Sequence, residues 1–275
     1  MSTETSTPAT MPTPSVGSVF RMFLLAAFAI VVASVFAGMV LHSLDPDVPL
    51  MDALQGLKGL IAGALATSTA LAFTVMVAAR GLTLARLRLV PGRESGFDLL
   101  VAIVGVLSLG QALDSATTLA GLGTGGSMSA IRRALEGASG PELLLAVVTI
   151  GILAGVAEEL FFRSYMQSMF RERWDARRAV LVTAVCFGVL HLDPVHAPLA
   201  IALGIYLGYL TERTGSALPA MVCHVVNNAV YTVITAIVGS YGGRDINLVL
   251  GGAAAVLFAL CILRLHSSFS TAPRS

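Results

Sequence analysis

Charge is the scarcest feature of this sequence. Only 12% of the 275 residues are Asp, Glu, Lys or Arg, whereas 56% are apolar, and the mean hydropathy is +0.83. A soluble globule of this size needs polar side chains over most of its exterior, and 17 basic with 16 acidic residues cannot cover it. The composition excludes a water-soluble protein and predicts one that is embedded in a lipid bilayer.

Other features are missing as well. The formal net charge of +1 contains no basic excess, which excludes a nucleic-acid-binding protein. Cys186, Cys223 and Cys261 lie in apolar runs without paired spacing, so we expect buried hydrophobic residues rather than a disulfide framework or a zinc ribbon. The sequence contains no internal repeat, so it gives no support to an inverted-repeat transporter.

Long apolar runs predict an all-α, polytopic membrane protein with about eight transmembrane helices. Residues 1–18 are rich in Ser, Thr and Pro, and we expect them to form a disordered tail. The fifth and sixth runs are shorter than the roughly 20 residues that a perpendicular helix needs. The predicted spans cover residues 23–41, 57–79, 97–119, 143–162, 179–192, 198–210, 218–238 and 246–265.

The basic residues predict the topology. If the N-terminus is inside, 13 of the 17 fall in inner segments, the segment holding Arg163 included. Cytoplasmic loops carry the Lys/Arg excess, so both termini are predicted to be cytoplasmic in a multi-pass protein of the cell membrane.

The fourth span carries two adjacent carboxylates, Glu158 and Glu159. Neighbouring residues project about 100° apart around a helix, so one side chain can face a cavity while the other faces a helix partner. Glu159 and Arg163 are four residues apart in the favourable order for an ion pair, which leaves Glu158 freer. Upstream, Gly151 and Gly155 form a GxxxG pattern that lets another helix approach closely.

Two further spans carry histidines at apolar positions. Phe187 and His191 share one helix face in the fifth span, as do His224 and Asn228 in the seventh. His42, His196 and His266 fall in loops or at helix ends, and we interpret them as interfacial residues. Counted from its inner end, His191 lies deeper than Glu158 or His224, which predicts a later helix start or a tilted helix.

These groups suit amide hydrolysis. A partly desolvated glutamate has a raised pKa and is a competent general base for water. An imidazole and an asparagine amide are donors suited to the oxyanion that forms when water attacks a peptide carbonyl.

Over residues 143–235 the chain resembles the CPBP family, which comprises CAAX prenyl proteases and bacteriocin-processing or immunity (Abi) membrane proteins. Glu158-Glu159-xxx-Arg163 is similar to that family's EExxxR, Phe187-xxx-His191 to its FxxxH, and His224-xxx-Asn228 to its HxxxN/D. The resemblance implies an intramembrane endopeptidase with an active site open to the cytosol and a peptide or protein substrate reached from there or from the bilayer.

By position, the resemblance implies that Glu158 activates water, His191 assists, and His224 with Asn228 forms the oxyanion hole. Glu159, Arg163 and Phe187 are supporting residues. The chain then divides into the tail at 1–18, N-terminal membrane helices at 19–142, a CPBP-like catalytic core at 143–238, and a C-terminal helix with a short tail at 239–275.

Two alternatives remain open. One is a zinc-dependent protease in which Glu158, His191 and His224 bind the metal, although the chain has no HExxH motif. The other is a non-catalytic immunity or scaffold protein that keeps the polar cluster for packing. Our preferred interpretation needs no metal or other cofactor.

Overall fold

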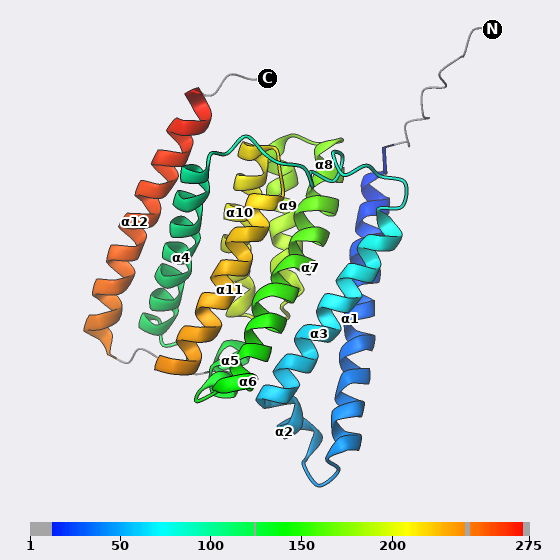
Figure 1. Ribbon diagram of the computed structural model, residues 1–275, viewed down its shortest axis with the longest axis vertical. Helices are drawn as coiled ribbons and strands as arrows, with labels where there is room; N and C mark the ends of the chain where they lie inside the picture. The colour runs from blue at the N-terminus through cyan, green and yellow to red at the C-terminus, as the bar shows by residue number, and fades with distance from the viewer. Residues whose placement is uncertain (1–12, 124, 240–242, 272–275) are drawn as a thin grey trace, which may run out of the picture.

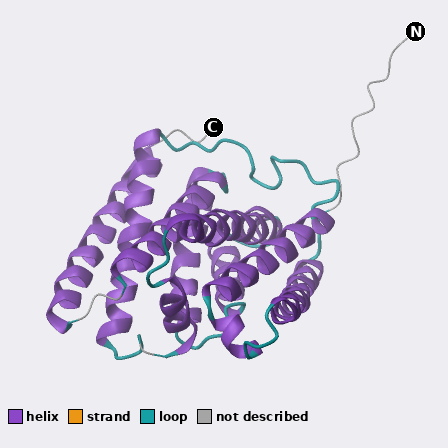
Figure 2. Cartoon of the chain, turned by 60° about the horizontal axis from the view of Figure 1, so that its bottom comes forward, coloured by secondary structure: helices purple, strands orange, loops and turns teal. Residues whose placement is uncertain are grey.

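The computed structural model describes residues 13–123, 125–239 and 243–271, and over these ranges the protein is all-α, as predicted. Figure 2 shows helices joined by loops. The elements are α1 (Val16–Leu44), α2 (Leu50–Gln55), α3 (Leu57–Ala78), α4 (Gly96–Leu119), α5 (Gly126–Leu135), α6 (Gly140–Ala146), η1 (Val147–Ala154), α7 (Gly155–Glu159), η2 (Leu160–Gln167), α8 (Ser168–Arg171), α9 (Ala176–Val189), α10 (His196–Thr214), α11 (Leu218–Val238) and α12 (Arg244–Thr271).

Six helices in the described ranges are long and apolar enough to cross a membrane, which makes this a polytopic membrane protein. They are α1, α3, α4, the continuous helix from Gly140 to Arg171, α11 and α12. The predicted fifth and sixth spans correspond to α9 and α10, which do not meet that criterion, and α9 has only 14 residues. The count of eight spans and the cytoplasmic termini stay predictions.

The helices pack as neighbouring pairs. α1 lies along α3, α4 along α12, and α9 along α10, while α11 packs against η1 and α7. In Figure 1 the α1/α3 and α4/α12 pairs form opposite edges, and α7 and α11 lie between them. The start of α1 and the end of α12 lie at the same end of the bundle (Figure 1), as an even number of crossings requires.

Two predicted boundaries are wrong. The tail was expected to cover residues 1–18, of which residues 1–12 lie outside the described ranges. Residues 16–18, however, form the first turn of α1, and Ser15 caps this helix by accepting a hydrogen bond from Ser18 N. The fourth span does not end at 162, because the helix continues to Arg171. Arg163 is therefore inside the span rather than in an inner loop, and its burial is possible because Glu159 pairs with it.

The GxxxG prediction is confirmed. A Cβ added at Gly151 would lie 3.1 Å from Ala229 Cα, and one at Gly155 would lie 3.2 Å from Val225 Cα. The absence of these two side chains lets α11 approach η1 and α7 closely, which brings the histidine of α11 next to the glutamates. The three cysteines are buried and free, as expected.

Candidate active site

The two glutamates lie on the short α7, between two segments wound more widely than an α-helix. η1 precedes α7 and η2 follows it, and both are π-helical. Such widened turns occur frequently at functional sites because they change which side chains face a given neighbour. Here they accompany a clear division: the Glu158 side chain is 16% exposed and lines a cavity, whereas that of Glu159 is completely buried.

Glu159 is the centre of a buried hydrogen-bond network. Its Oε1 accepts from Arg163 Nη1 at 2.9 Å and from His224 Nδ1 at 2.8 Å. Arg163 Nη2 also donates to Gly204 O on α10 at 3.2 Å, so the network ties three helices together. Because a carboxylate can only accept, the bond fixes the proton of His224 on Nδ1 and turns Nε2 away from Glu159.

Glu158 meets the other side of the same imidazole. His224 Nε2 lies 3.5 Å from Glu158 Oε2. The buried charges balance when the imidazole is protonated, because the two carboxylates then face one guanidinium and one imidazolium. Moving that proton to Glu158 also leaves the cluster neutral, so burial permits either location of the proton.

His191 follows the end of α9 and faces the same cavity. Its Nδ1 donates to Phe187 O at 2.9 Å, which leaves Nε2 as an acceptor in the neutral ring. The Phe187 ring packs against His191, against His224 and under the Arg163 guanidinium, with centroid distances of 5.0 Å and 5.8 Å and a guanidinium-to-ring distance of 4.8 Å. Phe187, itself part of the second motif, thus contacts residues of both other motifs.

The apparent mismatch in depth has a simple cause. Because the continuous helix that begins at Gly140 extends to Arg171, Glu158 is 13 residues from that end, roughly 20 Å at the standard helical rise. α9 runs in from the same end over 14 residues, which also corresponds to roughly 20 Å. His191 therefore lies at the level of Glu158, and the predicted later start is wrong because α9 begins at Ala176.

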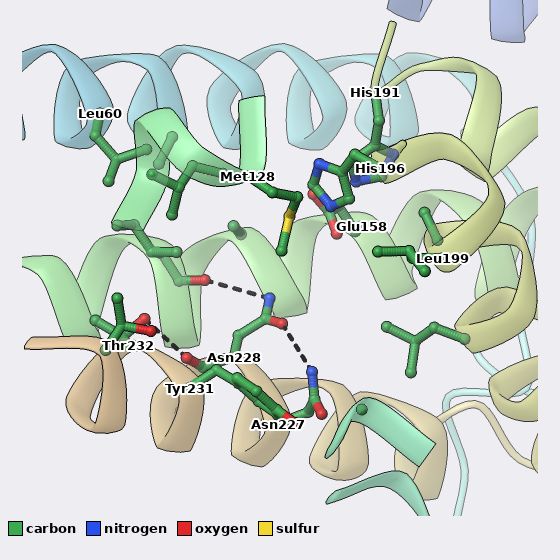
Figure 3. A pocket seen from close by; sticks show the side chains of 18 of the residues that line it. Leu60, Met128, Glu158, His191, His196, Leu199, Asn227, Asn228, Tyr231 and Thr232 are labelled. Atoms are coloured by element: carbon green, nitrogen blue, oxygen red, sulfur yellow. Dashed lines mark hydrogen bonds between the residues drawn. The ribbon is translucent and has the colours of Figure 1, made fainter. Parts of the chain in front are cut away.

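Asn228 lines the same cavity, one turn beyond His224. Its Nδ2 donates to Ile150 O and its Oδ1 accepts from Asn227 Nδ2, both at a long 3.4 Å. Figure 3 shows this amide apart from Glu158, His191 and His196. Within the described residues, the structure thus brings Glu158, His191 and His224 together and leaves Asn228 at the edge of the group.

His196 and Asn227 are among the cavity residues that sequence reasoning missed. His196, interpreted as interfacial, is the first residue of α10 and lines the cavity, with its ring centroid 4.3 Å from that of His191. Asn227 also lines it. His191 and His196 are separated by a break between two helices, so no helical spacing connects them. The presence of five histidines in so apolar a chain was the only available signal.

The cavity has a volume of about 580 Å³ and extends from these polar groups between α3, α4, α5 and α11. Most of its wall is apolar, with Leu60, Ile131 and Leu199 among the contributing side chains. Asp114, which forms an ion pair with Arg132 of α5, lies along the same wall. A pocket of this size and character suits an apolar ligand that is oriented by a few polar groups.

The three residues proposed as zinc ligands do not converge on one point. Across residues 13–123, 125–239 and 243–271, no three His, Cys, Asp or Glu side chains are placed to hold a metal ion. A catalytic zinc needs three protein ligands within about 2.1 Å of one position. The ligand set of the zinc alternative, Glu158, His191 and His224, does not meet this requirement in the observed arrangement.

Comparison with known proteins shows what the part of the chain that carries the site is similar to. Residues 140–230 match the family described as Type II CAAX prenyl endopeptidase Rce1-like, which confirms the predicted resemblance. A Bacillus subtilis (strain 168) protein named "Putative membrane peptidase YdiL" is 26% identical over 90 residues. That match covers 33% of this chain and 37% of the relative. The family match spans the part of the chain that carries the three motifs.

Proposed function

We propose that this protein is an intramembrane endopeptidase in which Glu158 activates a water molecule to hydrolyse a peptide bond. The observation that carries the proposal is the pairing of Glu158 with His224 across 3.5 Å at the polar end of the cavity. The match to an endopeptidase family over residues 140–230 supports the same reaction class.

The reaction follows from the positions of the protons. Glu158 takes a proton from water, and the water oxygen bonds to the carbonyl carbon while the C=O electrons move to oxygen. His224 Nε2–H, supplied by the protonated ring, donates to that oxyanion, and Asn228 Nδ2–H joins it by leaving its long bond to Ile150 O. When the C–N bond breaks, the leaving nitrogen takes the proton held by Glu158.

The other residues prepare these groups. Glu159, held by Arg163, keeps the proton of His224 on Nδ1 and thereby directs Nε2 toward Glu158. His191 presents Nε2 as an acceptor for the attacking water, because its Nδ1 is bound to Phe187 O. A peptide with an apolar attachment matches the apolar wall of the cavity, and the family description indicates a prenylated cysteine near the cleavage site.

The test uses purified protein reconstituted in liposomes. The probes are an internally quenched peptide that ends in an S-farnesylated Cys-aliphatic-aliphatic-Met sequence and the same peptide without the farnesyl group. We expect cleavage on the carboxyl side of the cysteine, read by mass spectrometry, and its loss in Glu158→Gln. Equal product formation by wild type and Glu158→Gln would contradict the proposal.

A further inference from the structure

His196 is a third imidazole in the cavity, and no motif of the sequence includes it. Its ring centroid lies 4.3 Å from that of His191 at an interplanar angle of 64°, an edge-to-face contact. Figure 3 shows both rings beside Glu158. A contact this close restricts how far either ring can turn.

His191 needs such a restriction because it lies outside regular helix. α9 ends at Val189, and the chain turns before α10 begins at His196. Within that turn Leu192 adopts φ +51°, a left-handed conformation that a leucine holds only when surrounding contacts impose it. The bond from His191 Nδ1 to Phe187 O fixes one edge of the imidazole, and the His196 ring packs against it.

The His196 ring is itself held by contacts at its backbone and side chain. Asp193 Oδ1 accepts from the backbone N–H groups of Val195 and His196 at 2.9 Å and 2.7 Å. Asp193 Oδ2 accepts from Ser127 N of α5 at 2.8 Å, and Ser127 Oγ lies 3.4 Å from His196 Nδ1. The turn is thus fastened to α5, which precedes the segment that matches the family.

We infer that His196 is a positioning residue for His191: its anchored ring holds the His191 imidazole with Nε2 toward the water that Glu158 activates. This inference rests on the proposed function. It assigns His196 no proton transfer, since ring packing is what the geometry provides. It also makes α5 part of the machinery that shapes the active site.

The first test reads the position of His191 without any substrate. The chain has five histidines, so ¹⁵N-histidine NMR of the protein in nanodiscs can be assigned by single substitutions. We expect His191 to show one tautomer, with the proton on Nδ1, in wild type and in His196→Phe. In His196→Ala we expect exchange between tautomers at His191 and an unchanged His224 signal. An unchanged His191 signal in His196→Ala would overturn the inference.

The second test uses the farnesylated quenched peptide. His196→Ala should lower kcat by about 10- to 100-fold at constant KM, because a small displacement of a reacting group has effects of this order. His196→Phe keeps a ring at this position and should restore kcat to within about 3-fold of wild type. A His196→Phe variant as slow as His196→Ala would overturn the inference, because an imidazole nitrogen would then be required.

Two further variants keep the tests decisive. Asp193→Ala leaves both rings but removes the anchor of the turn, so it should mobilise His191 in the same direction even if His196→Ala fails to fold. His42→Ala, in the last turn of α1, is the matched histidine control and should change neither readout. If Glu158→Gln retains full activity, the proposed function fails, whereas the NMR result alone still decides whether His196 positions His191.

Discussion

Two charged clusters in this protein, one around Glu212 and one around Glu158, differ in the groups that face the glutamate. At the arginine-rich end of the bundle, Glu212 Oε1 accepts from Arg88 at 2.7 Å and from Gln167 at 2.9 Å, and its Oε2 accepts from Arg171 at 2.7 Å. In the middle of the bundle, Glu158 lies 3.5 Å from a titratable group, the imidazole of His224. Arginine does not release its proton, so Arg88 and Arg171 only donate hydrogen bonds to Glu212, whereas His224 can exchange a proton with Glu158.

The comparison also separates Glu158 from its own neighbour in sequence. Glu159 is completely buried and is bound by Arg163 and His224. In being held by charged partners it resembles Glu212, which its two arginines hold. Fixed carboxylates hold helices and orient partners, whereas a carboxylate with an open side and a shared proton is suited to general-base chemistry.

The largest expected effect separates the two clusters by activity. Glu158→Gln should lower kcat on the quenched peptide by about 10³-fold, within the range of general-base catalysis, while the melting temperature stays at the wild-type value. Glu212→Gln is the matched control and should retain kcat within about 2-fold. A large loss in both variants would mean that the two carboxylates do not differ in role.

The next effect is on stability. Arg163→Met leaves Glu159 buried without its guanidinium and should cost about 3–5 kcal/mol of unfolding free energy. Thermal unfolding in detergent measures it. Removing both charges in Glu159→Gln/Arg163→Met should be less destabilising than Arg163→Met alone. The interpretation of this pair as structural would be wrong if Arg163→Met melted like wild type.

A smaller loss of stability is expected at the arginine-rich end. Glu212→Gln leaves Arg88 and Arg171 without their common anion, and both side chains are partly exposed, so water compensates in part. We expect a decrease of about 1–2 kcal/mol in the same unfolding measurement. If Glu212→Gln lost as much unfolding free energy as Arg163→Met, the claim that burial makes the Glu159–Arg163 pair more important for stability would be wrong.

The smallest effect concerns pH. The hydrogen bond from Arg86 lowers the pKa of Glu172, which directly follows α8. The stabilisation from this bond is therefore present above the unfolded pKa of about 4.3 and is lost as pH falls through the lower folded value. Because the pair is partly exposed, we expect about 0.5 kcal/mol between wild type and Glu172→Gln at pH 7. The difference should vanish near pH 3, and one that increased on acidification would contradict the sign.

Much of this arrangement is visible in the sequence because it depends on local spacing. The four-residue spacing of Glu159 and Arg163 predicted their ion pair, and Gly151 with Gly155 predicted the close approach of a helix. The motifs also predicted the resemblance to a CAAX endopeptidase family, and residues 140–230 match such a family. The roles of Glu158, His191, His224 and Asn228 in catalysis stay predictions.

What the sequence did not reveal depends on tertiary contacts. Arg163 was interpreted as part of an inner loop, because its second buried partner, Gly204 O, lies on another helix and is not visible in the local sequence. His196 was interpreted as an interfacial residue, because its contact with His191 is made across a turn and not along a helix face, so no regular spacing in the sequence predicts it. The short α9 was ambiguous, since hydropathy does not tell a full crossing from a helix that ends inside the bundle.

The most direct test of the central claim is hydrolysis of the farnesylated peptide in H₂¹⁸O under single-turnover conditions, by protein dialysed against EDTA. Water activated by Glu158 predicts one ¹⁸O in each new carboxylate, at the rate of untreated protein and with no covalent peptide adduct, and product formation about 10³-fold slower in Glu158→Gln. Complete loss of activity on chelation that zinc restores, or a trapped covalent adduct, would contradict it.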